Sequence, residues 1–186
     1  MPSHGITKSR PRRGSMSPLV GELEDNNLPK HFVATALMVR DDHILLIHHK
    51  KIGLWLPPGG HIETREDPVA ALRREIREET GVEIEILSDS VDPRASDEAV
   101  QVLPLPHHIQ IEHMADGHDH IDLVYLCRVR PGEAQRVEES LGLRWFSRED
   151  LASNDIVENV RYFGQQAIDE VAKREGRNPR RSSSLV

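Results

Sequence analysis

The chain has 186 residues, of which 37% are hydrophobic, and a formal net charge of −7 at pH 7. This length and composition predict one globular domain, and the acidic balance gives no overall bias towards a long nucleic acid. The single cysteine, Cys127, excludes an intramolecular disulfide framework, and no apolar run approaches the roughly 20 residues that cross a bilayer. We therefore expect a cytoplasmic protein with no membrane partner.

Both ends of the chain have the composition of mobile tails. Residues 1–19 contain Lys8, Arg10, Arg12 and Arg13, together with Ser, Pro and Gly and without any acid. Such a segment cannot bury enough apolar surface to fold. We predict a basic N-terminal tail over 1–28, a domain over 29–175 and a second mobile tail over 176–186. An organelle-targeting role for the basic segment is the alternative interpretation.

The elements before the middle of the chain are predicted to be strands. Apolar runs at 32–39 and 44–49 are divided by Arg40-Asp41-Asp42, which is typical of a hairpin.

The second half of the chain predicts more strands and two helices. Strands are expected at 82–87, 109–113, 121–130 and 143–146, with an irregular stretch at 88–106 and helices at 148–152 and 157–174. This order of elements indicates a mixed β-sheet with helices on two sides.

The segment from Gly60 to Val82 reads GHIETREDPVAALRREIREETGV. Asp67 is placed to cap a helix whose first position is Pro68, where a missing N–H is no loss. Gly81 is placed to end the helix in a left-handed conformation. Gly59 and Gly60 lie before the helix and, because they have no side chain, allow phosphate or metal to approach the backbone closely.

Three glutamates on this predicted helix, Glu75, Glu78 and Glu79, have the spacing i, i+3, i+4 and share one face. Like charges in this arrangement oppose helix formation, and a bound cation would reverse that penalty. Oxygen donors suit hard cations, so Mg²⁺ is the first expectation and Mn²⁺ the second. Arg74 is within reach of Glu66 in the entry loop, where a bidentate contact would fix loop to helix.

The segment resembles the Nudix box, in which glycine, glutamate, Arg-Glu, Glu-Glu and a final glycine recur at these spacings with aliphatic residues between them. Gly60, Glu66, Arg74 and Gly81 match fixed positions of this pattern, as do the three glutamates. With the flanking features, the resemblance extends over about 31–174. It implies the α/β/α sandwich of the Nudix fold, with a mixed sheet.

The resemblance also implies a reaction: Mg²⁺-dependent hydrolysis of a pyrophosphate bond in a nucleoside diphosphate linked to another moiety, by attack of water at phosphorus. Glu75, Glu78 and Glu79 would be metal ligands, and Gly60 would add a backbone oxygen. The family often uses a further carboxylate as ligand or base. Glu139 is the first candidate for it, followed by Glu138 and Glu112.

The nucleotide pocket is open to several interpretations. Trp55 and Trp145 are candidates for stacking on a base, although aromatic side chains more often fill cores. Asn154 is a candidate for hydrogen bonding to a base edge, with helix capping as the alternative. His120 and Asp122 share a strand face and are expected to border the substrate cleft.

Five histidines gather in the second half of the chain, at positions 107, 108, 113, 118 and 120. Their spacing fits no closed set of transition-metal ligands. Surface positions, or donors that face phosphate, are the preferred interpretation.

Two functional hypotheses follow. The first is a Nudix pyrophosphohydrolase that acts on a nucleoside triphosphate or on a nucleotide sugar such as ADP-ribose. The second is a Nudix-like module that senses a nucleotide without cleaving it. Such modules commonly lose glutamates of the box, and this chain keeps all of them, which favours the enzyme. The resemblance also allows a homodimer.

Overall fold

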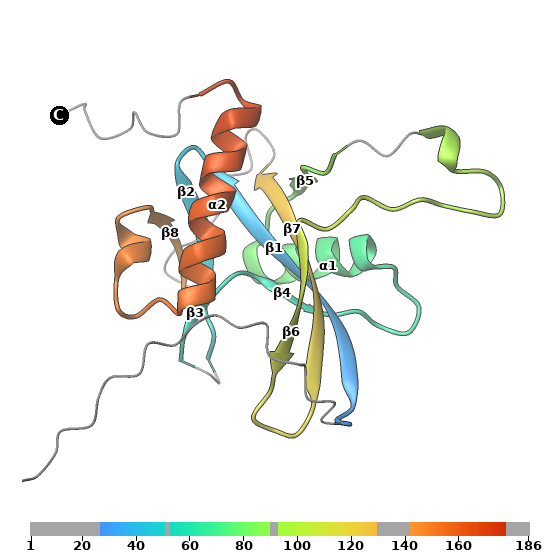
Figure 1. Cartoon of the computed structure of the whole chain (residues 1–186), viewed down its shortest axis with the longest axis horizontal. Helices are drawn as coiled ribbons and strands as arrows, with labels where there is room; N and C mark the ends of the chain where they lie inside the picture. Colours follow the sequence, from blue (N-terminus) through green and yellow to red (C-terminus); the bar gives the residue numbers. More distant parts are fainter. Residues whose placement is uncertain (1–26, 51–52, 90–92, 130–141, 178–186) are drawn as a thin grey trace, which may run out of the picture.

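A mixed sheet forms the centre of the fold, and the computed structural model describes residues 27–50, 53–89, 93–129 and 142–177 of the chain (Figure 1). Within these residues the sheet has eight strands. In chain order they are β1 (Lys30–Arg40), β2 (His43–His48), β3 (Trp55–Leu56), β4 (Gly59–His61), β5 (Ile84–Ile86), β6 (His108–His113), β7 (Asp119–Val129) and β8 (Leu143–Ser147).

The strand order along the sheet is β3-β2-β1-β7-β5, while β4 pairs with β1, β6 with β7 and β8 with β2. The long central pair, β1 and β7, is parallel and stays in register from Lys30 opposite Asp119 to Val39 opposite Arg128. The other pairs are antiparallel. The sheet is therefore mixed, as predicted.

Two helices, α1 (Pro68–Thr80) and α2 (Glu158–Arg174), cover opposite faces of this sheet (Figure 1). The alternation of side chains along β1 shows the division. Met38 packs in one core cluster with Leu72 of α1, whereas Leu37 packs in another with Ile168 of α2. The α/β/α sandwich expected from the sequence is thus confirmed.

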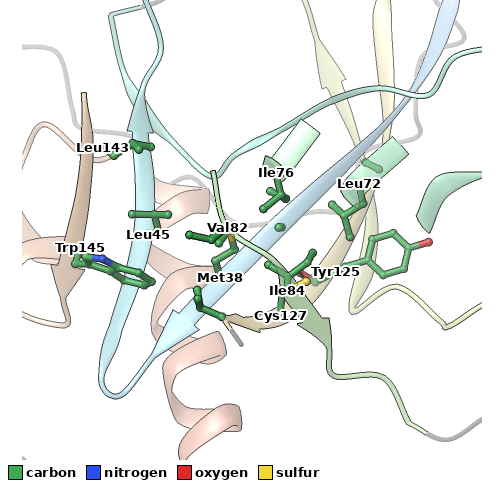
Figure 2. Close-up of a cluster of buried hydrophobic side chains, with 13 residues drawn as sticks. Met38, Leu45, Leu72, Ile76, Val82, Ile84, Tyr125, Cys127, Leu143 and Trp145 are labelled. Atoms are coloured by element: carbon green, nitrogen blue, oxygen red, sulfur yellow. Dashed lines mark hydrogen bonds between the residues drawn. The ribbon is translucent and has the colours of Figure 1, made fainter. Parts of the chain in front are cut away.

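The core cluster on the α1 side also contains Trp145 (Figure 2). Its side chain lies on β8, opposite Leu45 of β2, and only 7% of the residue is exposed. The guanidinium of Arg40 covers the ring, with Cζ 4.3 Å from the ring centre. Trp145 is therefore a packing residue of the core.

The predicted hairpin is confirmed by the pairing of Arg40 with His43, which leaves Asp41 and Asp42 as a two-residue turn. Asp41 has a φ of 53°, a left-handed value that aspartate tolerates. The helix predicted at 148–152 is only a short 3₁₀ turn, η4 (Asp150–Ala152), because the Asp150 carboxylate accepts a hydrogen bond from the Ser147 N–H and closes a local turn.

The long stretch between β5 and β6 is irregular where it is described, apart from the 3₁₀ turn η1 (Pro93–Ala95). Neither helix of the described part has the length and apolar character that a bilayer crossing requires. The predicted tails fall largely outside the described residues, which begin at 27 and end at 177.

Candidate active site

Helix α1 begins and ends at the predicted residues. The Asp67 carboxylate accepts hydrogen bonds from the N–H groups of Val69 (2.8 Å) and Ala70 (2.9 Å). At the other end Gly81 has a φ of 72° and donates its N–H to the Arg77 carbonyl, the arrangement of a left-handed C-terminal cap. These two caps set where the helix begins and ends.

Two of the three glutamates meet β4 at its glycines. The N–H of Gly59 donates to Glu79 Oε2 at 3.0 Å. The Glu75 carboxylate lies against Gly60, where an added Cβ would stand 2.5 Å from Glu75 Oε1. The third, Glu78, has a side chain that is 61% exposed. Only a residue without a side chain leaves room for this approach of a carboxylate to the strand.

Arg74 connects the entry loop to the helix. Its Nε and Nη2 donate to Glu66 Oε1 (2.8 Å) and Oε2 (2.9 Å), and Nη2 also donates to the His61 carbonyl at 3.0 Å. The guanidinium keeps the pKa of Glu66 below its usual range through the side-chain hydrogen bond. The same side chain reaches Glu75 Oε1 through Nη1 at 2.7 Å.

The positive charge near the glutamates is unevenly shared. Arg74 contacts Glu75, and its Nη1 is 3.5 Å from Glu78 Oε2. Among the described residues, no arginine or lysine forms an ion pair with Glu79. Burial raises the pKa of Glu79 to about 7; the hydrogen bond from Gly59 opposes this rise, and the charges of Glu75 and Glu78 add to it. Glu79 is thus a sheltered carboxylate that a cation would stabilise in its charged form.

The carboxylates of Glu75, Glu78 and Glu79 are not close enough to one another to form a compact set of ligands. In the described part of the chain, only one group of three or more His, Cys, Asp or Glu has ligand atoms that all lie within 4.8 Å of one another, and that group consists of histidines. The glutamates repel each other and each has a different environment: Glu75 contacts Arg74, Glu79 contacts Gly59, and Glu78 faces solvent. Their oxygens nevertheless fit a hard divalent cation in kind, and Gly60 leaves the space that such a site needs.

A cavity lies next to these carboxylates. It is lined by Thr35 of β1, Gly60 of β4, Gln110 of β6, Asp122 of β7 and Phe163 of α2, among other residues. Because Gly60 borders the cavity and also touches the Glu75 carboxylate, the acidic helix and the cavity meet at β4.

Buried polar atoms are present in the cavity wall. Asp122 is 1% exposed, and its Oδ1 has no hydrogen-bond partner among the described residues, whereas Oδ2 accepts from Gln110 Nε2 at 3.2 Å. Burial, and then the charge of Glu112, raise the pKa of Asp122 to about 7. His108 Nε2 is likewise buried without a partner there. The His108 ring stacks on Phe163, with centroids 3.7 Å apart. Such unpaired polar atoms are typical of a binding site.

The sequence-predicted substrate residues are only partly brought together. His120 and Asp122 both line the cavity, as their shared strand face suggested. Trp55 packs its ring edge-on against Phe146 and is not part of the cavity wall, and Trp145 is buried in the core.

Asn154 is exposed and also does not line the cavity. The capping alternative for it is wrong, because α2 has Val157 at its N-cap position and no side-chain cap. The candidate bases Glu138 and Glu139 fall outside the described residues, whereas Glu112 lies in the cavity wall.

The five histidines separate into three environments. His107 and His108 lie near Phe163, and His113 Nδ1 is 3.0 Å from Asp119 Oδ1. His118 and His120 instead join His31 and His61, two residues that were not among the histidines predicted from the sequence to gather. Spacing along the chain predicted no closed set of metal-ligating histidines. The pairing of β1 with β4 and β7 nevertheless brings histidines from distant positions close together.

Several cavity residues were also missed from sequence. Gln110 alternates with His108 and Glu112 along β6, so a period of two could have placed it on the same face. Asn159 and Phe163 follow the helical spacing i, i+4, but only the packing of α2 shows that they face the cavity.

The geometry defines the class of protein: a three-layer α/β domain with an acidic helix beside a polar cavity. The family model described as NUDIX domain matches residues 29–167. The chain therefore belongs to the Nudix family.

Individual relatives agree with this assignment. The chain is 30% identical over 105 residues to the "Probable DHNTP pyrophosphohydrolase" of Lactococcus lactis, covering 56% of this chain and 58% of that protein. It is 33% identical over 121 residues to the "Nucleoside triphosphatase NudI" of an Enterobacter species, covering 62% and 78%. A solved structure of a NUDIX-family hydrolase from Clostridium perfringens is 31% identical, with a TM-score of 0.66, and the match covers 77% of this chain and 99% of that one.

Proposed function

We propose that this chain is a Mg²⁺-dependent pyrophosphohydrolase that cleaves a pyrophosphate bond in a nucleoside triphosphate. A nucleotide sugar such as ADP-ribose is the second substrate class. The observation that supports the activity is the position of Glu75 and Glu79, whose carboxylates reach the glycine strand β4 at the edge of the cavity.

Glu75, Glu78 and Glu79 would hold the cation, with a backbone oxygen of Gly60 as a further donor. Mg²⁺, or Mn²⁺ in its place, supplies positive charge that offsets the anionic oxygens of the pyrophosphate and favours the leaving phosphate. Arg74 holds the helix and entry loop in one arrangement through Glu66 and His61. Glu66, Arg74 and Gly81 thus support the site without touching substrate.

The water that attacks phosphorus must lose a proton, and a general base has to be within reach of it. Of the carboxylates outside the glutamate helix that the sequence analysis considered, Glu112 is the one in the cavity wall. Its Oε1 accepts a hydrogen bond from Gln110 Nε2 at 2.9 Å, which fixes the carboxylate. We assign Glu112 as the first candidate for the base, and Glu139 and Glu138 follow.

The cavity would accept the nucleoside end of the substrate. Asp122 Oδ1 and His108 Nε2 are buried polar atoms that a base edge could satisfy, and the His108–Phe163 stack offers an aromatic wall. His120 borders the same space. The phosphates would then extend past Gly60 to the glutamates.

The choice of a triphosphate is supported by the names of relatives. The Lactococcus protein is named for DHNTP and the Enterobacter protein for nucleoside triphosphates. Because the chain spans only 58% of the length of the first of these, the substrate of the whole protein is our proposal. We further propose that the domain occupies 29–175, that the protein is cytoplasmic, and that its partner is a small nucleotide; a homodimer is compatible with this function.

The test is a hydrolysis screen over nucleoside triphosphates, ADP-ribose, dinucleoside polyphosphates, NADH and coenzyme A, with and without Mg²⁺. Pyrophosphate released from triphosphates is measured as phosphate with inorganic pyrophosphatase as coupling enzyme. Each of the other compounds is split into two phosphorylated products, which are separated and measured by chromatography. We expect release from triphosphates only when Mg²⁺ is present. Glu79→Gln should lower turnover by several orders of magnitude, because it removes a charge that helps to hold the cation. The exposed Glu98→Gln serves as the matched control.

Two results would contradict the proposal. One is unchanged turnover of Glu79→Gln at saturating Mg²⁺. The other is binding of nucleotides, measured by calorimetry, without cleavage of any compound in the screen, which would identify the sensing module instead.

A further inference from the structure

Four histidines from separate parts of the chain converge at one end of the sheet. They are His31 near the start of β1, His61 at the end of β4, His118 in the turn before β7 and His120 on β7. We call them the histidine cluster. One ring nitrogen of each can be chosen so that all four atoms lie within 4.8 Å of one another.

Strand register brings the cluster together. His31 lies directly opposite His120 in the parallel β1–β7 pair. His61 lies opposite Val33 in the β1–β4 pair, and Val33 is two residues from His31, so it points to the same face of the sheet. His118 is likewise two residues from His120. The convergence is thus built into the pairing of three strands.

Within the cluster the ring nitrogens face one another. The Nε2 atoms of His118 and His120 are 3.1 Å apart. In a tetrahedral zinc site with Zn–N distances of about 2.0–2.1 Å, two ligand nitrogens are separated by about 3.3 Å. The rings of the other members approach this pair, with centroid distances of 4.7 Å from His31 to His118 and 4.9 Å from His61 to His120.

Carboxylates lie on the outer side of the two inner histidines. His118 Nδ1 is 2.7 Å from Asp116 Oδ1, and His120 Nδ1 is 3.6 Å from Glu112 Oε2. A carboxylate on Nδ1 orients the ring and leaves Nε2 to face a metal, which is the usual second shell of a metal-binding histidine. The Nε2 pair is therefore presented inwards by its surroundings.

The burial of the cluster suits a site that can be filled from solvent. The side chains of His118 and His120 are only 18% and 12% exposed, whereas His31 and His61 are exposed residues. Two ligands are thus held by the fold, and two are free to close around an ion by small rotations.

We propose that the histidine cluster is a binding site for a borderline divalent transition metal, with Zn²⁺ as the first expectation and Co²⁺ or Ni²⁺ as substitutes. Four imidazole nitrogens suit these ions and do not suit Mg²⁺, which prefers oxygen ligands. The site is separate from the three glutamates in both residues and donor chemistry.

The position of the cluster gives the bound ion a place in the active site. His61, His118 and His120 line a second cavity together with Glu79. A metal there would add positive charge to a wall that faces the same space as the glutamate helix, where substrate phosphates would lie if the proposed function holds.

The experiment uses protein prepared without a histidine tag and dialysed against EDTA. Titration with Co²⁺ should produce the intense visible absorption of a four-coordinate nitrogen site at one equivalent, whereas cobalt bound by carboxylates in six-coordinate form absorbs weakly. Zn²⁺ should remove this absorption, and a large excess of Mg²⁺ should leave it in place. This readout does not depend on turnover, so it stands apart from the test of hydrolysis.

Variants assign the absorption to the cluster. His118→Ala, and separately the surface variant His31→Ala, should weaken Zn²⁺ binding measured by calorimetry, and Asp116→Asn should weaken it by about 10- to 100-fold through the second shell. His43→Ala removes an imidazole from β2, where His43 pairs with Arg40 at the opposite end of β1, and should leave Zn²⁺ binding unchanged. Thermal melts establish that each variant is folded.

The proposal would be overturned by a cobalt spectrum of six-coordinate type alone, or by Zn²⁺ affinity that stays the same in His31→Ala and His118→Ala. It would also be overturned if Glu79→Gln, rather than the histidine variants, removed the four-coordinate spectrum.

Discussion

Arg74 and Glu66 form a bidentate ion pair in which two parallel N–H groups of the guanidinium meet both carboxylate oxygens, at 2.8 and 2.9 Å. A third hydrogen bond, from Nη2 to the His61 carbonyl, connects the end of β4 to the same side chain. One arginine thus fixes the entry loop, the glycine strand and the glutamate helix relative to one another.

We expect Arg74→Lys to lower kcat/KM by about 10- to 100-fold, the usual effect of losing a residue that orients metal ligands. A lysine keeps the charge and loses the planar fork, so it cannot reach Glu66 and His61 together. The melting temperature should change little, because the pair is partly exposed. Steady-state kinetics at several Mg²⁺ concentrations measures the effect, and parental activity at low Mg²⁺ would count against this role.

The two glycines of β4 should respond differently to alanine. At Gly60 the atoms nearest to the new Cβ would be those at the flexible end of Glu75, with Oε1 at 2.5 Å. We expect Gly60→Ala to fold normally and to lose activity by about 10- to 100-fold, because the carboxylate is displaced. Kinetics and a thermal melt on the same preparation separate the two effects.

Gly59→Ala is the contrasting variant. Its Cβ would stand 2.4 Å from the Ala34 carbonyl oxygen and 2.7 Å from Thr35 Cα, both backbone atoms of β1 that cannot move aside. We expect a loss of about 1–3 kcal/mol in the free energy of unfolding from this overpacking. If denaturant titrations gave equal free energies of unfolding for the two variants, β4 could not approach the backbone of β1 as closely as described.

The buried carboxyl of Asp122 should make stability depend on pH. Its pKa is raised from 3.8 to about 7, so between these values the folded chain keeps a proton that the unfolded chain has lost. Stability is therefore lost as pH rises from about 4 to about 7, and the cost of the buried charge is fully present above that range.

Asp122→Asn cannot ionise, so we expect it to be more stable than the parent at pH 8 by up to about 4 kcal/mol, and similar at pH 4. Denaturant titrations of EDTA-dialysed protein over this pH range give the difference. The exposed Asp155→Asn reports the general effect of removing one negative charge. The expectation would be refuted if the difference in free energy of unfolding between the parent and Asp122→Asn were the same at every pH.

The only thiol of the chain, Cys127, should be unreactive in the native state. It is fully buried, and burial raises the pKa of the thiol far above its usual range, so little thiolate forms at pH 8. Labelling with a disulfide reagent should follow global unfolding and reach one equivalent in guanidinium chloride. Rapid labelling without denaturant would mean that the sheet opens at β7.

Features that depend on neighbouring residues were predictable from the sequence. The caps at Asp67 and Gly81, the hairpin at Asp41 and the strand alternation all follow from local backbone preferences, and the structure confirms them. The two-sided layering followed from the order of strands and helices along the chain, together with the family resemblance.

Features that depend on strand register were not predictable from spacing. The cavity joins Thr35, Gln110 and Phe163, and the histidine cluster joins β1 and β4 to β7, yet no local pattern specifies which strands are neighbours. Trp145 illustrates a related point: base stacking and core filling were both open for it, and the structure places it in the core. An aromatic residue in a strand has the same local signal whether it faces a core or a ligand, and only packing against Leu45 and Arg40 shows which applies.

The parallel pairing of β1 with β7 joins segments about 90 residues apart, with β2 and β4 on one edge of β1 and β7 on the other. During synthesis on the ribosome, the edge of β1 that pairs with β7 therefore stays unpaired until β7 has emerged. Nascent chains truncated before residue 119 keep that edge exposed, and such edges pair with other chains. Recognition by chaperones should consequently be strongest for nascent chains of intermediate length and should fall once β7 is available.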